Sequence, residues 1–104
     1  MKIVEGGKLM HSELRWGDGM VMVGDAATRP WQKSPRGAGG CTQSLFVYVD
    51  DIDAHFARAQ AAGATIVRAV EVTDYGPEYR ADKGYECVDP EGHHWWFAER
   101  VRSA

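Results

Sequence analysis

The pattern of apolar and polar positions near the start of the chain predicts a β-hairpin. Two runs with apolar side chains, Lys8–Trp16 and Met20–Gly24, flank an Asp-Gly pair at positions 18 and 19. Such a pair between apolar-containing runs is a strong signal for a two-residue turn, because both central positions adopt positive φ. This register places Arg15 opposite Met22.

Alternation along this hairpin predicts two different faces. Large apolar side chains share one face: Leu14, Trp16, Val21 and Val23. Polar and methionine side chains share the other: His11, Glu13, Arg15, Met20 and Met22. The His11–Glu13 spacing suits a metal or an acid–base pair, but Arg15 continues the row and favours a solvated face. The two methionines fit an adaptable pocket wall or an ordinary core equally well.

The next segment, residues 25–43, is rich in Gly, Pro, Ser and Thr. It is long for a loop inside a compact domain, which indicates a crossover linker or a functional flap. Ser44–Val49 then alternates around β-branched and aromatic residues and predicts a central strand.

A short helix is predicted after this strand. Asp50 or Asp51 would cap its start, and Gly63 would end it. Its apolar residues recur at helical spacing and would pack on a sheet: Ile52, Phe56 and Ala59.

Three further strands are predicted in the last third of the chain. Thr65–Val72 is rich in β-branched residues and is followed by an irregular stretch, Thr73–Lys83. Tyr85–Val88 and His93–Phe97 form a hairpin around an Asp-Pro-Glu-Gly turn at 89–92. A four-residue loop there places one set of side chains on one face: Tyr85, Cys87, His94 and Trp96. The opposite face carries Glu86, Val88, Trp95 and Phe97.

Composition narrows the class of protein. The chain has 104 residues, 44% of them hydrophobic, which suits one globular domain at 1–104. A net charge of −3 without a basic run argues against nucleic-acid binding. No apolar stretch is long enough for a membrane span, and the first residues lack a secretory pattern. Two cysteines are too few for a disulfide framework, so we expect a cytoplasmic protein with reduced thiols.

Three pieces, in their order, resemble the vicinal oxygen chelate superfamily, which includes glyoxalase I, bleomycin-resistance proteins and extradiol dioxygenases. They are Gly-Asp-Gly at 17–19 before a strand, Tyr-Val-Asp-Asp at 48–51 before a helix, and Asp-Pro-Glu-Gly-His-His-Trp at 89–95. The resemblance implies an α+β fold of βαβββ modules, whose curved mixed sheet forms a cup with helices on its convex side. Residues 1–24 would be a partial first module lacking its opening strand and helix, 25–43 a linker, and 44–100 a complete second module.

The resemblance also says where metal-using members place their ligands, usually His or Glu. On this chain those positions hold Met22, Ser44 and Trp96, and the fourth would precede Met1. A Met, a Ser and a Trp suit a divalent ion poorly. The resemblance is therefore closest to the metal-poor, resistance-protein-like branches, and it implies neither a metal nor a cofactor.

The predicted ligand site combines aromatic rings with polar and methionine side chains. Aromatic residues that would line it fit plain core packing equally well, and a structural role is favoured for the histidine at 94. Two of the residues, at 75 and 80, lie in a stretch that resembles the family's pocket-closing loop. The full set is His11, Glu13, Arg15, Met20, Met22, Ser44, Phe46, Tyr48, Tyr75, Arg80, Tyr85, His94 and Trp96.

The leading hypothesis is binding of a small organic, partly aromatic molecule, for resistance or sequestration and without metal chemistry. The alternatives are a metal-dependent lyase, isomerase or dioxygenase using His11, Glu13 and His94, and a structural or assembly module with a vestigial cup. A homodimer is expected, because the first module has no helix of its own to cover its apolar face. The competing explanation is a truncated chain, in which the opening strand and helix that would cover this face are simply absent.

Overall fold

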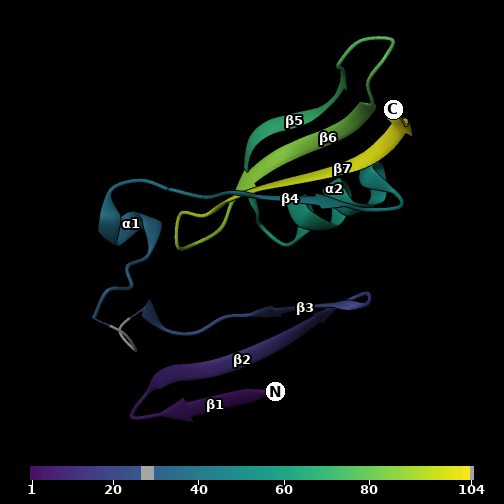
Figure 1. The fold of residues 1–104 in the computed structure, drawn as a ribbon. Helices are drawn as coiled ribbons and strands as arrows, with labels where there is room; N and C mark the ends of the chain where they lie inside the picture. Colours follow the sequence, from purple (N-terminus) through teal and green to yellow (C-terminus); the bar gives the residue numbers. More distant parts are fainter. Residues whose placement is uncertain (27–29, 104) are drawn as a thin grey trace. The chain divides into compact units, whose positions relative to one another are not determined.

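The computed structural model describes residues 1–26 and 30–103, so positions 27–29 of the predicted linker lie outside the described residues. The chain divides into two compact units, Met1–Ser34 and Pro35–Ala104. Strands dominate both units, and helices are few (Figure 1). The predicted α+β class is confirmed. The division into a partial and a complete module stays a prediction.

The first unit contains a three-stranded antiparallel sheet in the order β1-β2-β3. Its strands are β1 (Lys2–Glu5), β2 (Lys8–Trp16) and β3 (Gly19–Met22). The hairpin β2–β3 is the one expected from the sequence. Strand β1 was not predicted, because its four residues contain too few alternations to distinguish a strand from a loop.

The β2–β3 turn differs in register from the prediction. Trp16 pairs with Gly19 and Arg15 with Met20, so the turn residues are Gly17 and Asp18. Gly17 has φ +57°, as the first central position of a type II′ turn requires, and no described residue other than glycine has positive φ. The predicted pairing was therefore wrong by two residues. A shift of two keeps every side chain on its face, so the two predicted faces hold.

The second unit contains a four-stranded sheet in the order β4-β7-β6-β5, in which β4 runs parallel to β7 and the other pairs are antiparallel. A short helix, α1 (Pro35–Ala38), begins the unit inside the predicted linker. Strands β5 and β6 extend into the stretch expected to be irregular and leave only 75–80 as a loop. The remaining elements are β4 (Leu45–Tyr48), α2 (Ile52–Ala61), β5 (Thr65–Asp74), β6 (Ala81–Val88) and β7 (His94–Arg102).

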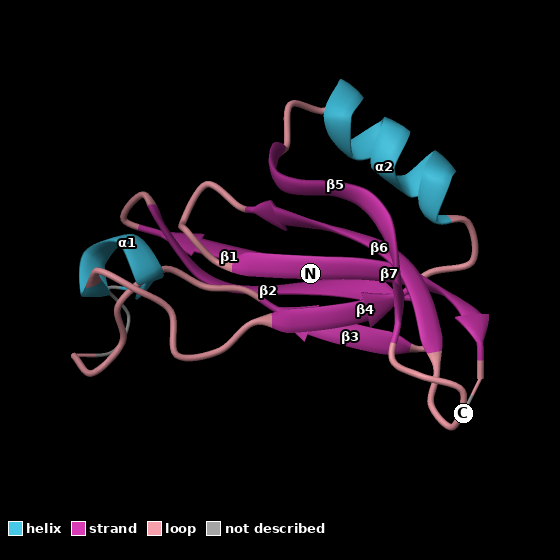
Figure 2. Ribbon diagram, turned by 90° about the horizontal axis from the view of Figure 1, so that it is seen from above, coloured by secondary structure: helices cyan, strands magenta, loops and turns pink. Residues whose placement is uncertain are grey.

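Helix α2 forms for the reasons that the sequence indicates. The side chain of Asp51 accepts a hydrogen bond from the backbone N–H of Ala54 at 3.1 Å, which identifies Asp51 as the N-cap. Gly63, with φ +86°, follows the C-cap Ala62 and lets the chain leave the helix. Phe56 and Ala59 pack against the buried core, so the predicted apolar stripe faces the sheet. Figure 2 shows the helix lying against this sheet near β5.

The core of this unit lies between α2 and the sheet. Ile52 and Tyr85 are both fully buried, and the Tyr85 ring lies 4.9 Å from that of Phe56 and 5.6 Å from that of Phe97, centroid to centroid. The Tyr85 hydroxyl is 2.7 Å from Nδ1 of His55. Burial raises the pKa of Tyr85 to about 12 and lowers the pKa of His55. Both groups are therefore neutral members of the core near neutral pH.

The final hairpin differs from the prediction in its loop length, and this changes which residues share the face of the predicted site. Val88 pairs with His94, so its loop has five residues, 89–93, and not four. Asp89 holds this loop by accepting hydrogen bonds from the backbone N–H of Glu91 and of His93 at 3.0 Å. One extra loop residue moves one strand's side chains to the opposite face relative to the other strand. Tyr85 therefore faces α2 and is not part of the ligand site, while Glu86 shares a face with Trp96.

Candidate functional site

The face of the four-stranded sheet opposite α2, here called the distal face, carries the aromatic part of the predicted site. The register sets Phe46 beside Trp96 and Tyr48 beside Ala98. Glu86 lies opposite Trp96 on the other side of β7. The predicted aromatic residues Phe46, Tyr48 and Trp96 thus share one face.

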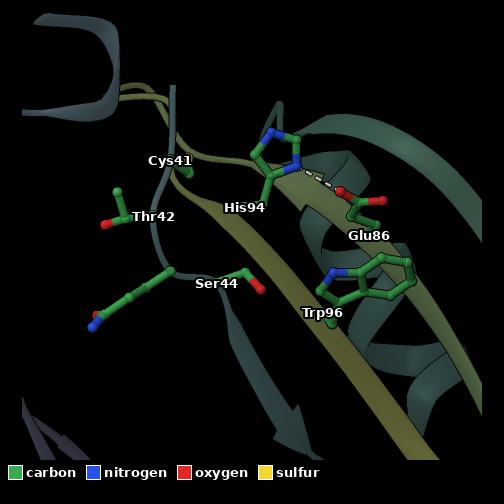
Figure 3. A pocket seen from close by; sticks show the side chains of 7 residues that line it. Cys41, Thr42, Ser44, Glu86, His94 and Trp96 are labelled. Carbon is green, nitrogen blue, oxygen red and sulfur yellow. Dashed lines mark hydrogen bonds and ion pairs between the residues drawn. The ribbon is translucent and has the colours of Figure 1, made fainter. Parts of the chain in front are cut away.

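A depression of about 300 Å³ lies at one end of this face (Figure 3). Ser44, His94 and Trp96 were predicted from the sequence, and the structure brings all three together there. The other lining residues were missed, because three of them sit in the predicted linker and Glu86 was assigned to the wrong face. The residues that line the depression are Cys41, Thr42, Gln43, Ser44, Glu86, His94 and Trp96.

Glu86 positions the histidine of this depression. Its carboxylate Oε2 lies 2.5 Å from Nδ1 of His94 (Figure 3), and the Glu86 residue is only 8% exposed. This contact fixes the ring and directs Nδ1 to the carboxylate. Because a carboxylate only accepts, Nδ1 carries the proton, and Nε2 has no hydrogen-bond partner among the described residues. It can therefore accept from a ligand when the ring is neutral and donate to one when the ring is protonated.

The aromatic rings beside the depression are accessible. Phe46 is 44% and Tyr48 42% exposed, and their centroids lie 5.3 Å apart in an edge-on arrangement. The guanidinium of Arg68 lies 5.4 Å from the Trp96 ring centroid and 3.3 Å from Glu71. Sequence reasoning missed Arg68 because its approach depends on the pairing of β5 with β6. Exposed rings of this kind are suited to stacking on a planar ligand.

A second group lies farther along the distal face and is built around Asp82, which is 3% exposed. Its Oδ2 accepts from the Tyr48 hydroxyl at 2.9 Å and from Arg80 Nε at 3.0 Å. Arg100 Nε lies 3.3 Å from Oδ1. Tyr48 and Arg80 were predicted; Asp82 and Arg100 were not, since they meet only through the β6–β7 register.

The loop at 75–80 carries two predicted site residues, Tyr75 and Arg80. The Arg80 guanidinium lies 5.1 Å from the Tyr75 ring centroid, and the Tyr75 N–H donates to the Arg80 carbonyl at 3.2 Å. Arg102 fastens the loop by donating to Asp74 at 2.5 Å and to the Gly76 carbonyl at 2.8 Å. The Arg102 hydrogen bond lowers the pKa of Asp74 to about 2. The loop therefore holds Tyr75 and Arg80 at the β5–β6 end of the sheet.

The remaining predicted residues belong to the first unit. His11 Nε2 lies 2.8 Å from Glu13 Oε2, and Met20 and Met22 pair with Arg15 and Glu13 across the β2–β3 hairpin. They share one face, as predicted, and their contact with a ligand stays a prediction. Within the described residues, no group of three or more His, Cys, Asp or Glu side chains is arranged to hold a metal ion.

The order of elements in the second unit, β4-α2-β5-β6-β7, is a βαβββ module. The family model of the Glyoxalase/Bleomycin resistance protein/Dioxygenase superfamily matches residues 2–97. The chain belongs to this superfamily. The resemblance seen in the sequence is thereby confirmed, and membership is consistent with small-molecule binding.

Similar proteins extend this comparison. An uncharacterised protein of Mycobacterium bovis is 36% identical over 99 residues, which are 92% of this chain and 62% of that protein. An uncharacterised protein of Mycobacterium tuberculosis has the same identity, over 55% of its length. The chain thus spans less than two thirds of these curated relatives. The crystal structure of TioX from Micromonospora sp. ML1 matches with a TM-score of 0.69 and 34% identity, covering 97% of this chain and 76% of TioX.

No helix within the described ranges combines the length and apolar character needed to cross a membrane.

Proposed function

We propose that this protein binds a small organic molecule with a planar aromatic part on the distal face and sequesters it without metal chemistry. The observation that carries the proposal is the row formed by Trp96 and Phe46 beside the depression that contains His94. Ligand sites are lined mainly by apolar and aromatic groups and contain a few placed polar ones. Here the rings provide the stacking surface, and His94 Nε2 and the Ser44 hydroxyl provide polar contacts.

Geometry argues for stacking as the main source of affinity. Trp96 is flanked on one side by Phe46 and covered by the Arg68 guanidinium, so a planar molecule can replace or join an existing stack. Stacked aromatic pairs contribute about 0.5–1.5 kcal/mol beyond the area that they bury. Glu86 is buried and engaged by His94, so its role is to orient the histidine.

Native mass spectrometry of freshly purified protein tests the proposal directly. We expect an adduct of a few hundred daltons that is released by denaturation and absorbs in the near ultraviolet. If no adduct is present, titration with biphenyl-4-carboxamide should quench tryptophan fluorescence saturably. The proposal fails if the protein carries no organic molecule and also shows no saturable quenching at millimolar probe.

The proposed absence of metal chemistry makes a separate prediction. The family's ligand positions hold Met22, Ser44 and Trp96, which suit a divalent ion poorly. Elemental analysis of protein purified without chelator should find well below one zinc, nickel, manganese or iron per chain. A near-stoichiometric metal that resists dialysis would contradict this prediction and favour a metal-dependent enzyme of the glyoxalase kind.

We also propose that the protein is a homodimer. On the first unit's sheet, Leu14 is 53% exposed and Trp16 and Val23 are exposed as well. A contiguous apolar face of this kind marks a protein interface, and two copies could cover it symmetrically. We also propose that the protein is cytoplasmic, and the free thiols of Cys41 and Cys87 support this.

Replacement of Trp16 by Glu should dissociate the dimer, because the new carboxylate would be desolvated in the interface. Sedimentation equilibrium at micromolar concentration measures this. Arg15→Glu is the matched control, since it places the same charge on the next residue but on the opposite face of β2, and it should remain dimeric. A wild-type protein that sediments as a folded monomer would contradict the dimer.

A further inference from the structure

The far end of the distal face holds more positive charge and more hydrogen-bond donors than its own residues can use. Asp82 is the only carboxylate for which an ion pair with Arg80 or Arg100 is found among the described residues. Two guanidinium groups against one carboxylate leave a local charge of +1. Together they offer ten N–H donors, whereas Asp82 and the Tyr48 hydroxyl present only three oxygen atoms.

The hydrogen bonds at Asp82 use only part of the donors that the two arginines offer. Oδ2 accepts two good hydrogen bonds, from Tyr48 and Arg80. Oδ1 is buried and has no hydrogen bond from any described residue, although Arg100 Nε lies 3.3 Å away. A buried carboxylate oxygen without a donor is costly. Arg100 is thus paired with Asp82 by charge, at a distance of 3.3 Å, and not by a well-aligned hydrogen bond.

Arg100 instead lies over an aromatic ring. Its guanidinium carbon is 4.4 Å from the Tyr48 ring centroid, and that of Arg80 is 5.1 Å from the Tyr75 ring centroid. A guanidinium placed over a ring face keeps N–H groups that the ring does not use, and the planar fork of these donors matches a carboxylate or phosphate. The side chains of Arg80 and Arg100 are 45% and 40% exposed, so an anion can reach them.

Nearby acidic groups do not cancel this charge. On β5, Glu71 is paired with Arg68 and Asp74 with Arg102. Those two carboxylates therefore already have cationic partners.

The arginines lie on the same face as the proposed aromatic site. Arg100 follows Trp96 by four residues on β7, a separation of about 13 Å along a strand. The register places Ala98 between them, with Gly84 on one side and Tyr48 on the other, and Ala98 is only 2% exposed. Gly84 has no room for a side chain, because an added Cβ would lie 2.6 Å from the Phe97 carbonyl oxygen. A molecule stacked on Trp96 and Phe46 can extend along the exposed Tyr48 ring, which lies 5.3 Å from that of Phe46, to the arginines.

We propose that the ligand carries an oxyanion, a carboxylate, phosphate or sulfonate, at the end opposite its contact with His94, and that Arg80 and Arg100 bind it. The statement that the ligand also has an aromatic part rests on the proposed function. The anion contact stands on Arg80, Arg100 and Asp82. Tyr48 links the two parts, because its ring stacks on Arg100 and its hydroxyl holds Asp82.

Two readouts separate the anion contact from the aromatic contact. The probes are biphenyl-4-carboxylate and its neutral analogue biphenyl-4-carboxamide, with inorganic phosphate as an anion that has no ring. NMR of the arginine Nε–H signals in ¹⁵N-labelled protein reports on Arg80 and Arg100. The chain has four tryptophans, so the part of the fluorescence quenching that is lost in Trp96→Ala reports on Trp96. Arg80→Gln and Arg100→Gln are the variants, with Arg58→Gln on α2 as the control.

We expect the carboxylate to bind about tenfold more tightly than the carboxamide, a difference of ~1.4 kcal/mol, because its hydrogen bonds to the guanidinium groups are charge-assisted. Arg80→Gln and Arg100→Gln should remove this preference by lowering carboxylate affinity more than carboxamide affinity, whereas Arg58→Gln should keep it. The carboxylate and phosphate should both shift the Nε–H signals of Arg80 and Arg100 saturably. If a glutamine variant fails to fold, the matching Arg→Lys variant keeps the charge and should weaken the preference by losing the planar fork.

Each failure has its own meaning. Equal affinity for the two biphenyls, or unshifted Arg80 and Arg100 signals at millimolar carboxylate and phosphate, overturns the oxyanion proposal even if Trp96 is quenched. Shifted arginine signals without any tryptophan quenching would support the oxyanion site and contradict the aromatic site of the proposed function.

Discussion

Tyr85→Ala is expected to lower the free energy of unfolding by about 3–5 kcal/mol, as truncation of a buried aromatic side chain does. Tyr85 is fully buried between α2 and the sheet and contacts the rings of Phe56 and Phe97. Truncation would open a cavity and leave His55 without its hydroxyl partner. Urea denaturation followed by far-ultraviolet circular dichroism measures the loss.

Tyr85→Phe distinguishes a core role from a role in binding. It keeps the ring and removes only the hydroxyl, so the unfolding free energy should fall by about 1–3 kcal/mol while ligand affinity stays the same. The decisive comparison is affinity for biphenyl-4-carboxamide in variant and wild type. Weakened binding at unchanged stability would show that Tyr85 contacts the ligand, as the four-residue loop predicted from the sequence had implied.

Trp96→Ala should weaken binding of biphenyl-4-carboxamide by about tenfold, which corresponds to ~1.4 kcal/mol. The side chain forms the wall of the depression, and its loss removes both stacking and apolar contact area. Isothermal titration calorimetry is the appropriate measurement, because the substitution also removes a fluorescent reporter. Trp96 is partly exposed, so the variant should remain folded.

The adjacent tryptophan provides the matched control. Trp95 lies on the opposite face of β7, where it stacks on Phe97 at 5.9 Å between centroids and donates to Asp89 at 2.9 Å. Trp95→Phe should reduce stability and leave affinity unchanged. If Trp96→Ala binds as tightly as wild type, the wall formed by Trp96 is not part of the site, and the proposed function loses its main support.

Local sequence signals determined the elements that depend on neighbouring residues alone. Asp51 and Gly63 mark the two ends of α2, and both ends could be predicted because capping needs only contacts within one turn of the helix. The two faces of the β2–β3 hairpin followed from alternation, and they survived a register error of two because side chains repeat every second residue. The ordered motifs at 17–19, 48–51 and 89–95 were sufficient to identify the superfamily.

Tertiary structure decided which side chains meet. The β6–β7 loop has five residues because the Asp89 side chain binds backbone N–H groups across it, and that single extra residue moved Tyr85 to the core and Glu86 to the distal face. The Asp82–Arg100 pair likewise joins residues 18 positions apart. Strand register depends on hydrogen bonds and packing between distant segments, and no local pattern encodes a shift of one residue that exchanges the two faces.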